Sequence, residues 1–160
     1  MGRVFLLGDN IDTDQLAPGQ YMRGGIEALA THCLEAIRPE FATSVRPGDV
    51  IVAGRNFGAG SSREQAAEAL IHLGLAAVIA QSFAGIFYRN AINLGLPVLV
   101  ASETEEIADG ATCTLDLASA RLSVGAGDFE LEPIPENLQL LLADGGLVPH
   151  LKKRFAEARP

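Results

Sequence analysis

The sequence predicts an α/β fold, because short apolar runs typical of buried strands alternate with stretches of helical periodicity. Strand-like runs occupy residues 49–53, 75–80 and 97–101. Between them, residues 63–73 and 83–94 carry apolar side chains three and four positions apart, as expected for helices that pack on a sheet. Ser82 is the expected N-cap of the second helix. Strands separated by single helices pair in parallel through right-handed crossovers.

The N-terminal part of the chain adds a strand, a polar turn and a further helix. Residues 3–7 form an apolar run that predicts a strand, and residues 8–14 form a turn with three aspartates. The turn lacks the glycine and distal glutamate of an EF-hand loop, so Asx-turn chemistry accounts for the aspartates better than calcium binding does. Apolar periodicity predicts a helix over residues 26–37, which Pro39 ends.

The C-terminal third favours short antiparallel strands followed by helices. Alternating apolar and polar residues separated by turns predict a small β-meander or barrel over residues 112–117, 121–124 and 129–131. Helical spacing follows over residues 133–142 and 148–156. The chain therefore combines a parallel α/β centre with a β-rich end.

A glycine-rich loop, residues 56–64, lies between the central strand and the helix that follows it. It holds glycines at positions 58 and 60, then Ser61 and Ser62 where the helix is expected to begin. Unpaired backbone N–H groups and a partial positive charge at a helix N-terminus favour an anion there. Arg63 adds a planar donor fork that matches a carboxylate or a phosphate.

A purely structural interpretation of this loop stays open at this point. Ser61 and Glu64 are spaced as a capping box, in which the serine caps the helix and the glutamate reaches back. Glycines ahead of a helix also make tight turns, and Arg63 would then be a solvated surface charge. The loop matches neither G-x-x-x-x-G-K-[ST] nor G-x-G-x-x-G, so the sequence does not predict a nucleotide site.

Composition and charge argue against several classes of partner. The chain has 160 residues, 48% of them hydrophobic and 20% charged, and we treat residues 1–160 as one globular domain. A net charge of −8 argues against a nucleic-acid backbone or an anionic membrane as the main partner. The sequence has no 18-residue apolar run and no basic N-terminal region followed by an apolar core, so we expect a cytoplasmic protein.

The cysteines and histidines predict no metal site on this chain. Cys33 and Cys113 lie far apart and form no C-x-x-C pair or cluster set, so we expect reduced, partly buried thiols. The three histidines are scattered, without neighbours at metal-ligand spacing.

Several short motifs taken together resemble those of a known enzyme family. In chain order they are Asp12-Thr13-Asp14, Pro18-Gly19, Tyr21-Met22-Arg23-Gly24, Val52-Ala53-Gly54, Asn56-Phe57-Gly58-Ala59-Gly60-Ser61-Ser62-Arg63-Glu64, Ala77-Val78-Ile79-Ala80, Ser82-Phe83-Ala84, Ile86-Phe87-Tyr88 with Asn90, and Gly95-Leu96-Pro97-Val98. Their combination resembles the small subunit of the isopropylmalate dehydratase and homoaconitase group, which corresponds to the mobile C-terminal domain of aconitase. The resemblance runs from about Val4 to Val100 and more loosely to the end of the chain.

The resemblance implies a fold, a partner and a cofactor. The fold would be a single β/β/α swivelling domain. A separate large catalytic subunit, in a heterodimer or heterotetramer, would carry a [4Fe–4S] cluster whose iron acts as Lewis acid toward a departing hydroxyl. This chain would bind no cluster and would be inactive alone. The reaction would be the reversible dehydration and hydration of a small hydroxy-carboxylate.

The resemblance also implies roles for five residues. By motif match, Ser61 would remove the carbon-bound proton and Asp14 would be the active-site aspartate. Arg63 would hold a substrate carboxylate with support from Ser62, and Arg23 would contact the variable substituent of the substrate. A serine hydroxyl is a weak base, but its alkoxide becomes accessible where preorganised amides and a guanidinium stabilise it.

The identity of the substrate is less tightly predicted than the reaction. Arg23 favours a polar or charged substituent, whereas Tyr21 and Met22 offer apolar contact. Ala59 and Gln65 also depart from residues that are often cysteine and histidine in relatives. We expect 3-isopropylmalate dehydration, a step of leucine biosynthesis. Homoaconitase and 2,3-dimethylmalate or citramalate-type dehydratases are the alternatives. A non-catalytic carboxylate-binding module is the alternative of another class, and the charge disfavours nucleic-acid binding.

Overall fold

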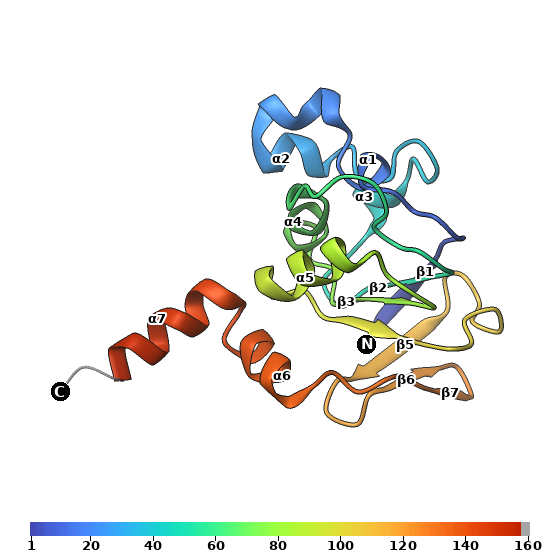
Figure 1. Cartoon of the computed structure of the whole chain (residues 1–160). Coiled ribbons are helices and arrows are strands. Elements are labelled where there is room, and N and C mark those ends of the chain that lie inside the picture. Colours follow the sequence, from blue (N-terminus) through green and yellow to red (C-terminus); the bar gives the residue numbers. More distant parts are fainter. Residues whose placement is uncertain (158–160) are drawn as a thin grey trace.

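The computed structural model describes residues 1–157, which form a mixed seven-stranded sheet with helices packed against it (Figure 1). The strand order is β4-β3-β2-β1-β5-β6-β7. The strands are β1 (Gly2–Leu6), β2 (Val50–Ala53), β3 (Ala77–Ala80), β4 (Val98–Val100), β5 (Thr112–Asp116), β6 (Arg121–Val124) and β7 (Gly127–Glu130). The predicted α/β class is confirmed.

The first four strands pair in parallel, as the alternation of strands and helices predicts. Val4 pairs with Val50 across β1 and β2, and Val78 pairs with Val98 across β3 and β4. Every residue of β2 and β3 is buried, because parallel strands are covered on both faces. Strand β5 then joins the free edge of β1 in antiparallel orientation, and β5, β6 and β7 form the predicted meander rather than a barrel.

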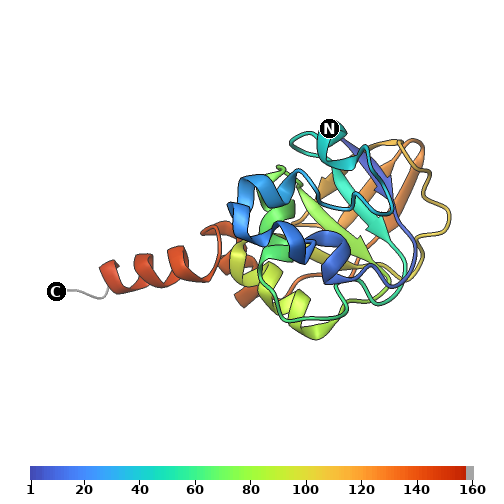
Figure 2. The same cartoon turned by 90° about the horizontal axis from the view of Figure 1, so that it is seen from above.

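The helices gather mainly on one face of the parallel half (Figures 1 and 2). They are α1 (Thr13–Leu16), the 3₁₀ helix η1 (Gly19–Gly24), α2 (Gly25–Ala30), α3 (Phe41–Ser44), α4 (Gln65–His72), α5 (Gly85–Leu94), α6 (Glu136–Ala143) and α7 (Leu147–Glu157). Two apolar clusters fill the interior: Phe5 and Ile51 belong to the cluster under the helices, and Val4 and Val50 to the cluster under the meander. The alternation along β1 to β4 thus places successive side chains in different cores.

The helix predicted over residues 26–37 is wrong in its second half. Helix α2 ends at Ala30 and gives way to a series of turns. Leu34 has a positive φ of 61° and donates its N–H to Gln15 O at 2.7 Å instead of to Ala30. A left-handed residue cannot continue an α-helix, so the apolar periodicity here fills the core from irregular backbone.

The serines predicted to cap helices are used elsewhere. Helix α4 is capped at Glu64 and α5 at Ala84, in each case without a side-chain hydrogen bond, so the Ser61–Glu64 capping box and the Ser82 cap are wrong. The Ser82 hydroxyl instead accepts from the backbone N–H of Asn56 at 2.8 Å. The Ser82 side chain therefore binds the backbone of the glycine loop and not the N-terminus of α5.

Helix α7 projects from the body of the chain (Figures 1 and 2) and has no buried residue. Phe155 is 68% exposed. Near the start of α7, Asp144 accepts from His150 at 2.7 Å and from Lys153 at 2.8 Å. Within residues 1–157, no helix is long and apolar enough to cross a membrane.

Both cysteines are free thiols in the structure and are buried more deeply than the partial burial that the sequence predicts, with Cys33 1% and Cys113 2% exposed. Burial raises the pKa of the Cys33 thiol well above its usual range, so this side chain is a poor nucleophile. Cys33 and Cys113 belong to the two different apolar clusters.

Candidate functional site

The candidate site forms where the loop after β1 meets the glycine loop after β2. The backbone N–H of Thr13 donates to Ala59 O at 2.8 Å, and that of Gly58 donates to Ile11 O at 2.7 Å. Asp12 and Ala59 also form an isolated parallel bridge. Two segments that are far apart in sequence are thereby joined beyond the ends of their parallel strands, where ligands of open α/β sheets bind.

Helix α1 is only four residues long, and its N-terminus is fixed by side-chain caps. The Asp12 carboxylate accepts from Gln15 N at 2.8 Å, and the Gln15 side chain accepts from Asp12 N at 2.9 Å. This reciprocal pair is a capping box. The aspartate-rich turn therefore uses Asx chemistry, as predicted, and it fixes the start of α1.

Two glycines shape the loop around α1 and α5. Gly58 has φ +82°, and a Cβ there would lie 2.2 Å from Phe87 Cγ. Gly60 has φ +107°, and its Cβ would lie 3.0 Å from Thr13 Oγ1. Both positions combine a backbone conformation that side chains disfavour with a close approach that a side chain would block.

Ser61 lies at the surface against a buried threonine. The Ser61 N–H donates to Thr13 Oγ1 at 3.0 Å, and the two hydroxyl oxygens are also 3.0 Å apart. Thr13 is 2% exposed, whereas Ser61 is exposed. The Ser61 hydroxyl is therefore anchored on the buried Thr13 hydroxyl at one side of an otherwise exposed residue.

Arg63 and Asp14 meet beside this serine. Arg63 Nη1 donates to Asp14 Oδ1 and to Ala17 O, the latter at 2.8 Å. The Arg63 side chain is 20% exposed and that of Asp14 is 73% exposed. Three predicted site residues, Ser61, Arg63 and Asp14, thus gather at the contact between α1 and the glycine loop.

Ser62 completes the exposed segment and is held through its backbone. Its carbonyl oxygen accepts from Asn90 Nδ2 of α5 at 3.0 Å. Within residues 1–157, the N–H groups of Ser62 and Arg63 have no acceptor. With α4 beginning just beyond them, these amides and the arginine fork provide donors for a carboxylate.

Arg23 stands apart from this group. It lies on η1, is exposed, and within the described residues its side chain makes no ion pair or hydrogen bond. The neighbouring Tyr21 ring stacks on His32, just after α2, at a centroid distance of 3.5 Å. The structure therefore does not bring Arg23 into contact with Ser61 or Arg63.

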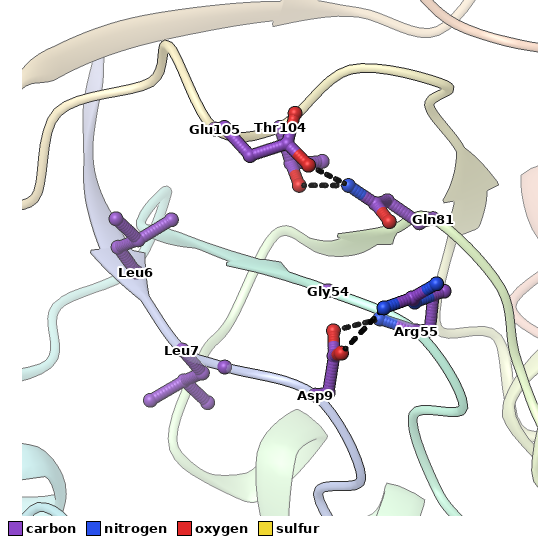
Figure 3. A pocket seen from close by; sticks show the side chains of 9 residues that line it. Leu6, Leu7, Asp9, Gly54, Arg55, Gln81, Thr104 and Glu105 are labelled. Atoms are coloured by element: carbon purple, nitrogen blue, oxygen red, sulfur yellow. Dashed lines mark hydrogen bonds and ion pairs between the residues drawn. The ribbon is translucent and has the colours of Figure 1, made fainter.

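A separate polar cavity of about 330 Å³ opens at the ends of β1 and β2 (Figure 3). In it, Asp9 accepts from the backbone N–H of Arg55 at 2.7 Å, and Gln81 donates to Glu105 at 2.9 Å. The bond from Arg55 holds the pKa of the Asp9 carboxyl below its usual range. None of the five predicted site residues lines this cavity, and Ser61, Ser62 and Arg23 are exposed.

Sequence reasoning gave no role to two residues that hold the site. Thr13 stands inside the Asp12-Thr13-Asp14 motif, and Asn90 is the last residue of the motif that begins Ile86-Phe87-Tyr88. Their places in these motifs were the available signal. Their contacts with residues 61 and 62 depend on the tertiary fold and could not be read from spacing.

The residues that the structure describes do not fit an iron–sulfur cluster. Among residues 1–157, no group of three or more His, Cys, Asp or Glu side chains could hold a metal ion. The two cysteines are both buried, in separate cores. A cluster bound by cysteine thiolates therefore has no ligand set in the part of the chain that the structure describes.

Comparisons with known proteins identify relatives over nearly the whole chain. The methanogen homoaconitase small subunit of Methanothermobacter thermautotrophicus is 52% identical over 95% of this chain and 90% of its own length. The 3-isopropylmalate dehydratase small subunit of Nautilia profundicola is 49% identical over 98% and 96%. A crystal structure of a 3-isopropylmalate dehydratase protein from Methanocaldococcus jannaschii, 46% identical, superposes with a TM-score of 0.92 over 97% and 94%.

The family model for the aconitase C-terminal domain matches residues 14–103, which include the glycine loop, η1 and both helices α4 and α5. The matched span is more than half of the chain and contains all five predicted site residues. The predicted family and fold are thus confirmed: this chain is a member of the aconitase C-terminal domain family.

Proposed function

We propose that this chain is the small subunit of 3-isopropylmalate dehydratase, a hydro-lyase that works only with a large subunit. The observation that carries the proposal is the gathering of Ser61, Arg63 and Asp14 on one exposed surface. Relatives of this name share 49% and 47% of their residues with this chain over almost its whole length, which supports the same assignment. As the small subunit of this enzyme, the chain would act in leucine biosynthesis, and we expect it in the cytoplasm.

In the proposed reaction, Ser61 and Arg63 have complementary tasks. The Ser61 oxygen, as alkoxide, takes the proton from a substrate carbon. The C–H electron pair becomes the new C=C bond, and the hydroxyl leaves from the neighbouring carbon. Arg63 and the amides of Ser62 and Arg63 hold the adjacent carboxylate, where negative charge grows in the transition state. Asp14 holds the guanidinium of Arg63 in place until substrate binds.

The cofactor belongs to the partner in this proposal. Hydro-lyases of the aconitase type use an iron–sulfur cluster, and the described residues of this chain offer no ligands for one. When bound on the large subunit, the cluster supplies Lewis acidity for the departing hydroxyl. The open surface around Ser61 then closes against the large subunit, because an exposed site excludes no water by itself.

The test is reconstitution with the large subunit under anaerobic conditions. Formation of the unsaturated acid is followed by its absorbance, with 3-isopropylmalate, homocitrate, citramalate and 2,3-dimethylmalate as substrates. We expect turnover of 3-isopropylmalate by the complex and none by this chain alone. Activity of the isolated, cluster-free chain would contradict the proposal. A stable complex with an intact cluster that binds these acids without turnover would favour the carboxylate-binding module.

Homoaconitase is a second candidate because of Arg23. This arginine is exposed, and no described residue neutralises its charge, so it is available to a distal carboxylate. The relative at 52% identity is named a methanogen homoaconitase small subunit. Under this alternative, homocitrate-type acids would be preferred over 3-isopropylmalate.

The variant Arg23→Val separates the two candidates. If Arg23 selects a carboxylate, kcat/KM for the tricarboxylic substrate falls by about 10-fold or more, whereas that for 3-isopropylmalate holds or rises. Arg89→Val, a change at another exposed arginine, is the matched control. An equal change for both substrates would remove Arg23 as the selector.

A further inference from the structure

The hydroxyl of Thr13 makes two contacts with Ser61. Its oxygen accepts from the Ser61 N–H at 3.0 Å and lies 3.0 Å from Ser61 Oγ. A threonine hydroxyl has one proton and two lone pairs. Because one lone pair is taken by the Ser61 amide, the proton is left for a second acceptor, and the nearby acceptor is Ser61 Oγ.

The direction of the second contact follows from the chemistry of the proposed base. Between two neutral hydroxyls, either oxygen can donate. Once Ser61 has lost its proton, Ser61 Oγ can only accept, and Thr13 must donate. A hydrogen bond to an ionised oxygen is about twice as strong as one between neutral groups. The contact therefore strengthens when the alkoxide forms.

The Thr13 hydroxyl is also fixed before any substrate arrives. The residue is 2% exposed, and its own N–H donates to Ala59 O at 2.8 Å. It is the first residue of α1, whose start is held by the Asp12 capping box. A β-branched side chain has few rotamers, so this donor needs little reorganisation when charge develops.

The shape of the glycine loop supports the same contact. A Cβ at Gly60 would lie 3.0 Å from Thr13 Oγ1, and φ at this glycine is +107°. Without a side chain at position 60, the backbone can bring the Ser61 amide and hydroxyl onto one threonine oxygen. The loop thus has the conformation that this double contact requires.

We propose that Thr13 is a positioning residue for Ser61, which orients the serine through its amide and donates a hydrogen bond to its oxygen in the deprotonated state. This inference rests on the proposed function, in which Ser61 is the base. Thr13 itself touches no substrate. It acts by making the deprotonated serine more accessible near neutral pH.

The kinetic test compares Thr13→Val and Thr13→Ser in the reconstituted complex. Valine keeps the shape and removes the hydroxyl, and serine restores the hydroxyl. We expect kcat of Thr13→Val to fall by about 10²-fold with little change in KM. The limb of the kcat profile that rises with pH should move to higher pH, and Thr13→Ser should recover most of both losses.

The matched control is Thr43→Val, because the Thr43 hydroxyl only donates to its own segment, at Glu40 O, 3.0 Å away. This variant should keep wild-type kcat and pH profile. A Thr13→Val complex with kcat within about twofold of wild type and an unshifted profile would overturn the proposal. A loss of kcat that Thr13→Ser fails to rescue would also overturn it.

A second measurement separates this inference from the proposed function. Amide hydrogen exchange of Ser61 in the isolated chain needs no large subunit and no substrate. We expect faster exchange at Ser61 in Thr13→Val than in wild type and in Thr43→Val, because the acceptor of that N–H is gone. Equal exchange in all three chains would overturn the positioning contact even if the complex is active. If the wild-type complex turns over no hydroxy acid, the proposed function fails while exchange still tests the contact.

Discussion

The junction of α1 with the glycine loop and the helix α7 are both exposed, yet they are held in opposite ways. At the junction, hydrogen bonds join residues that are 48 and 49 positions apart in the sequence, Thr13 to Ser61 and Asp14 to Arg63. Among residues 1–157, the side-chain hydrogen bonds of α7 go to Asp144, six and nine positions away. The polar contacts of the junction therefore span the fold, whereas those of α7 are local in sequence.

This difference separates a built site from a surface feature. Holding backbone with positive φ and close contacts is unfavourable unless surrounding structure enforces it, so such geometry concentrates where function needs it. Gly58 and Gly60 meet this description. Helix α7 has an exposed apolar side, but no described residue covers it. The following predictions test whether the two regions differ in stability as they differ in contacts.

The largest effect is expected for Gly58→Ala. The new Cβ would lie 2.2 Å from Phe87 Cγ in the core, at a residue with φ +82°. Overpacking and backbone strain together should lower the free energy of unfolding by about 3 kcal/mol or more, measured by urea denaturation. Gly110→Ala is the control, because Gly110 has φ +73° with open space around it. Strain alone should cost about 1 kcal/mol there. Equal losses would show that the close approach to Phe87 is unimportant.

An intermediate effect is expected for Asp109→Asn. Asp109 accepts from Leu6 N and from both terminal nitrogens of Arg38, each at 2.8 Å. These bonds connect the end of β1 to the turn before β5. Because the carboxylate is 47% exposed, solvent screens it, and we expect a loss of about 1 kcal/mol at pH 7 by urea denaturation.

The same residue predicts a pH dependence. Arg38 holds the pKa of the Asp109 carboxyl below its usual value. A lowered folded-state pKa contributes stability that is present above the unfolded pKa of about 4 and is lost as pH falls through the folded pKa. The stability difference between wild type and Asp109→Asn should therefore shrink as the pH is lowered from 5 toward 2. A difference that stays constant over that range would contradict this assignment.

The smallest effect is expected on α7. Phe155 is 68% exposed, so Phe155→Ser should change the free energy of unfolding by no more than about 0.5 kcal/mol. Phe41→Leu, in the fully buried core, should cost about 1 kcal/mol in the same denaturation experiment. A loss above about 2 kcal/mol for Phe155→Ser would mean that α7 packs against the body of the isolated chain.

The fold could be predicted from the sequence where local patterns and tertiary structure agree. The apolar runs that became β2, β3 and β4 are buried on both faces, and a buried parallel strand leaves that signature in composition. The strands of the meander show an equally clear alternation of apolar and polar residues in the sequence. The helix boundaries could not be predicted as well from the sequence. Leu34 forms a hydrogen bond with Gln15, and Ser82 forms one with Asn56, and both partners are far away in the sequence.

The candidate site also has a part that the sequence predicts and a part that it does not. The resemblance named Ser61, Arg63 and Asp14, and the structure brings them together. The support under them was not predictable, because Thr13 reaches Ser61 only after β1 and β2 have paired. The placement of Arg23 relative to Ser61 also depends on tertiary structure, which a motif does not encode.

If this chain supplies the base of a hydro-lyase, Ser61→Ala must remove proton abstraction from the reconstituted complex. Complex assembly and thermal unfolding are measured alongside turnover of the preferred hydroxy acid. We expect kcat to fall by about 10³-fold or more with KM little changed, because the group that takes the proton is gone. A Ser61→Ala complex that assembles and retains kcat within about tenfold of wild type would contradict this role of Ser61.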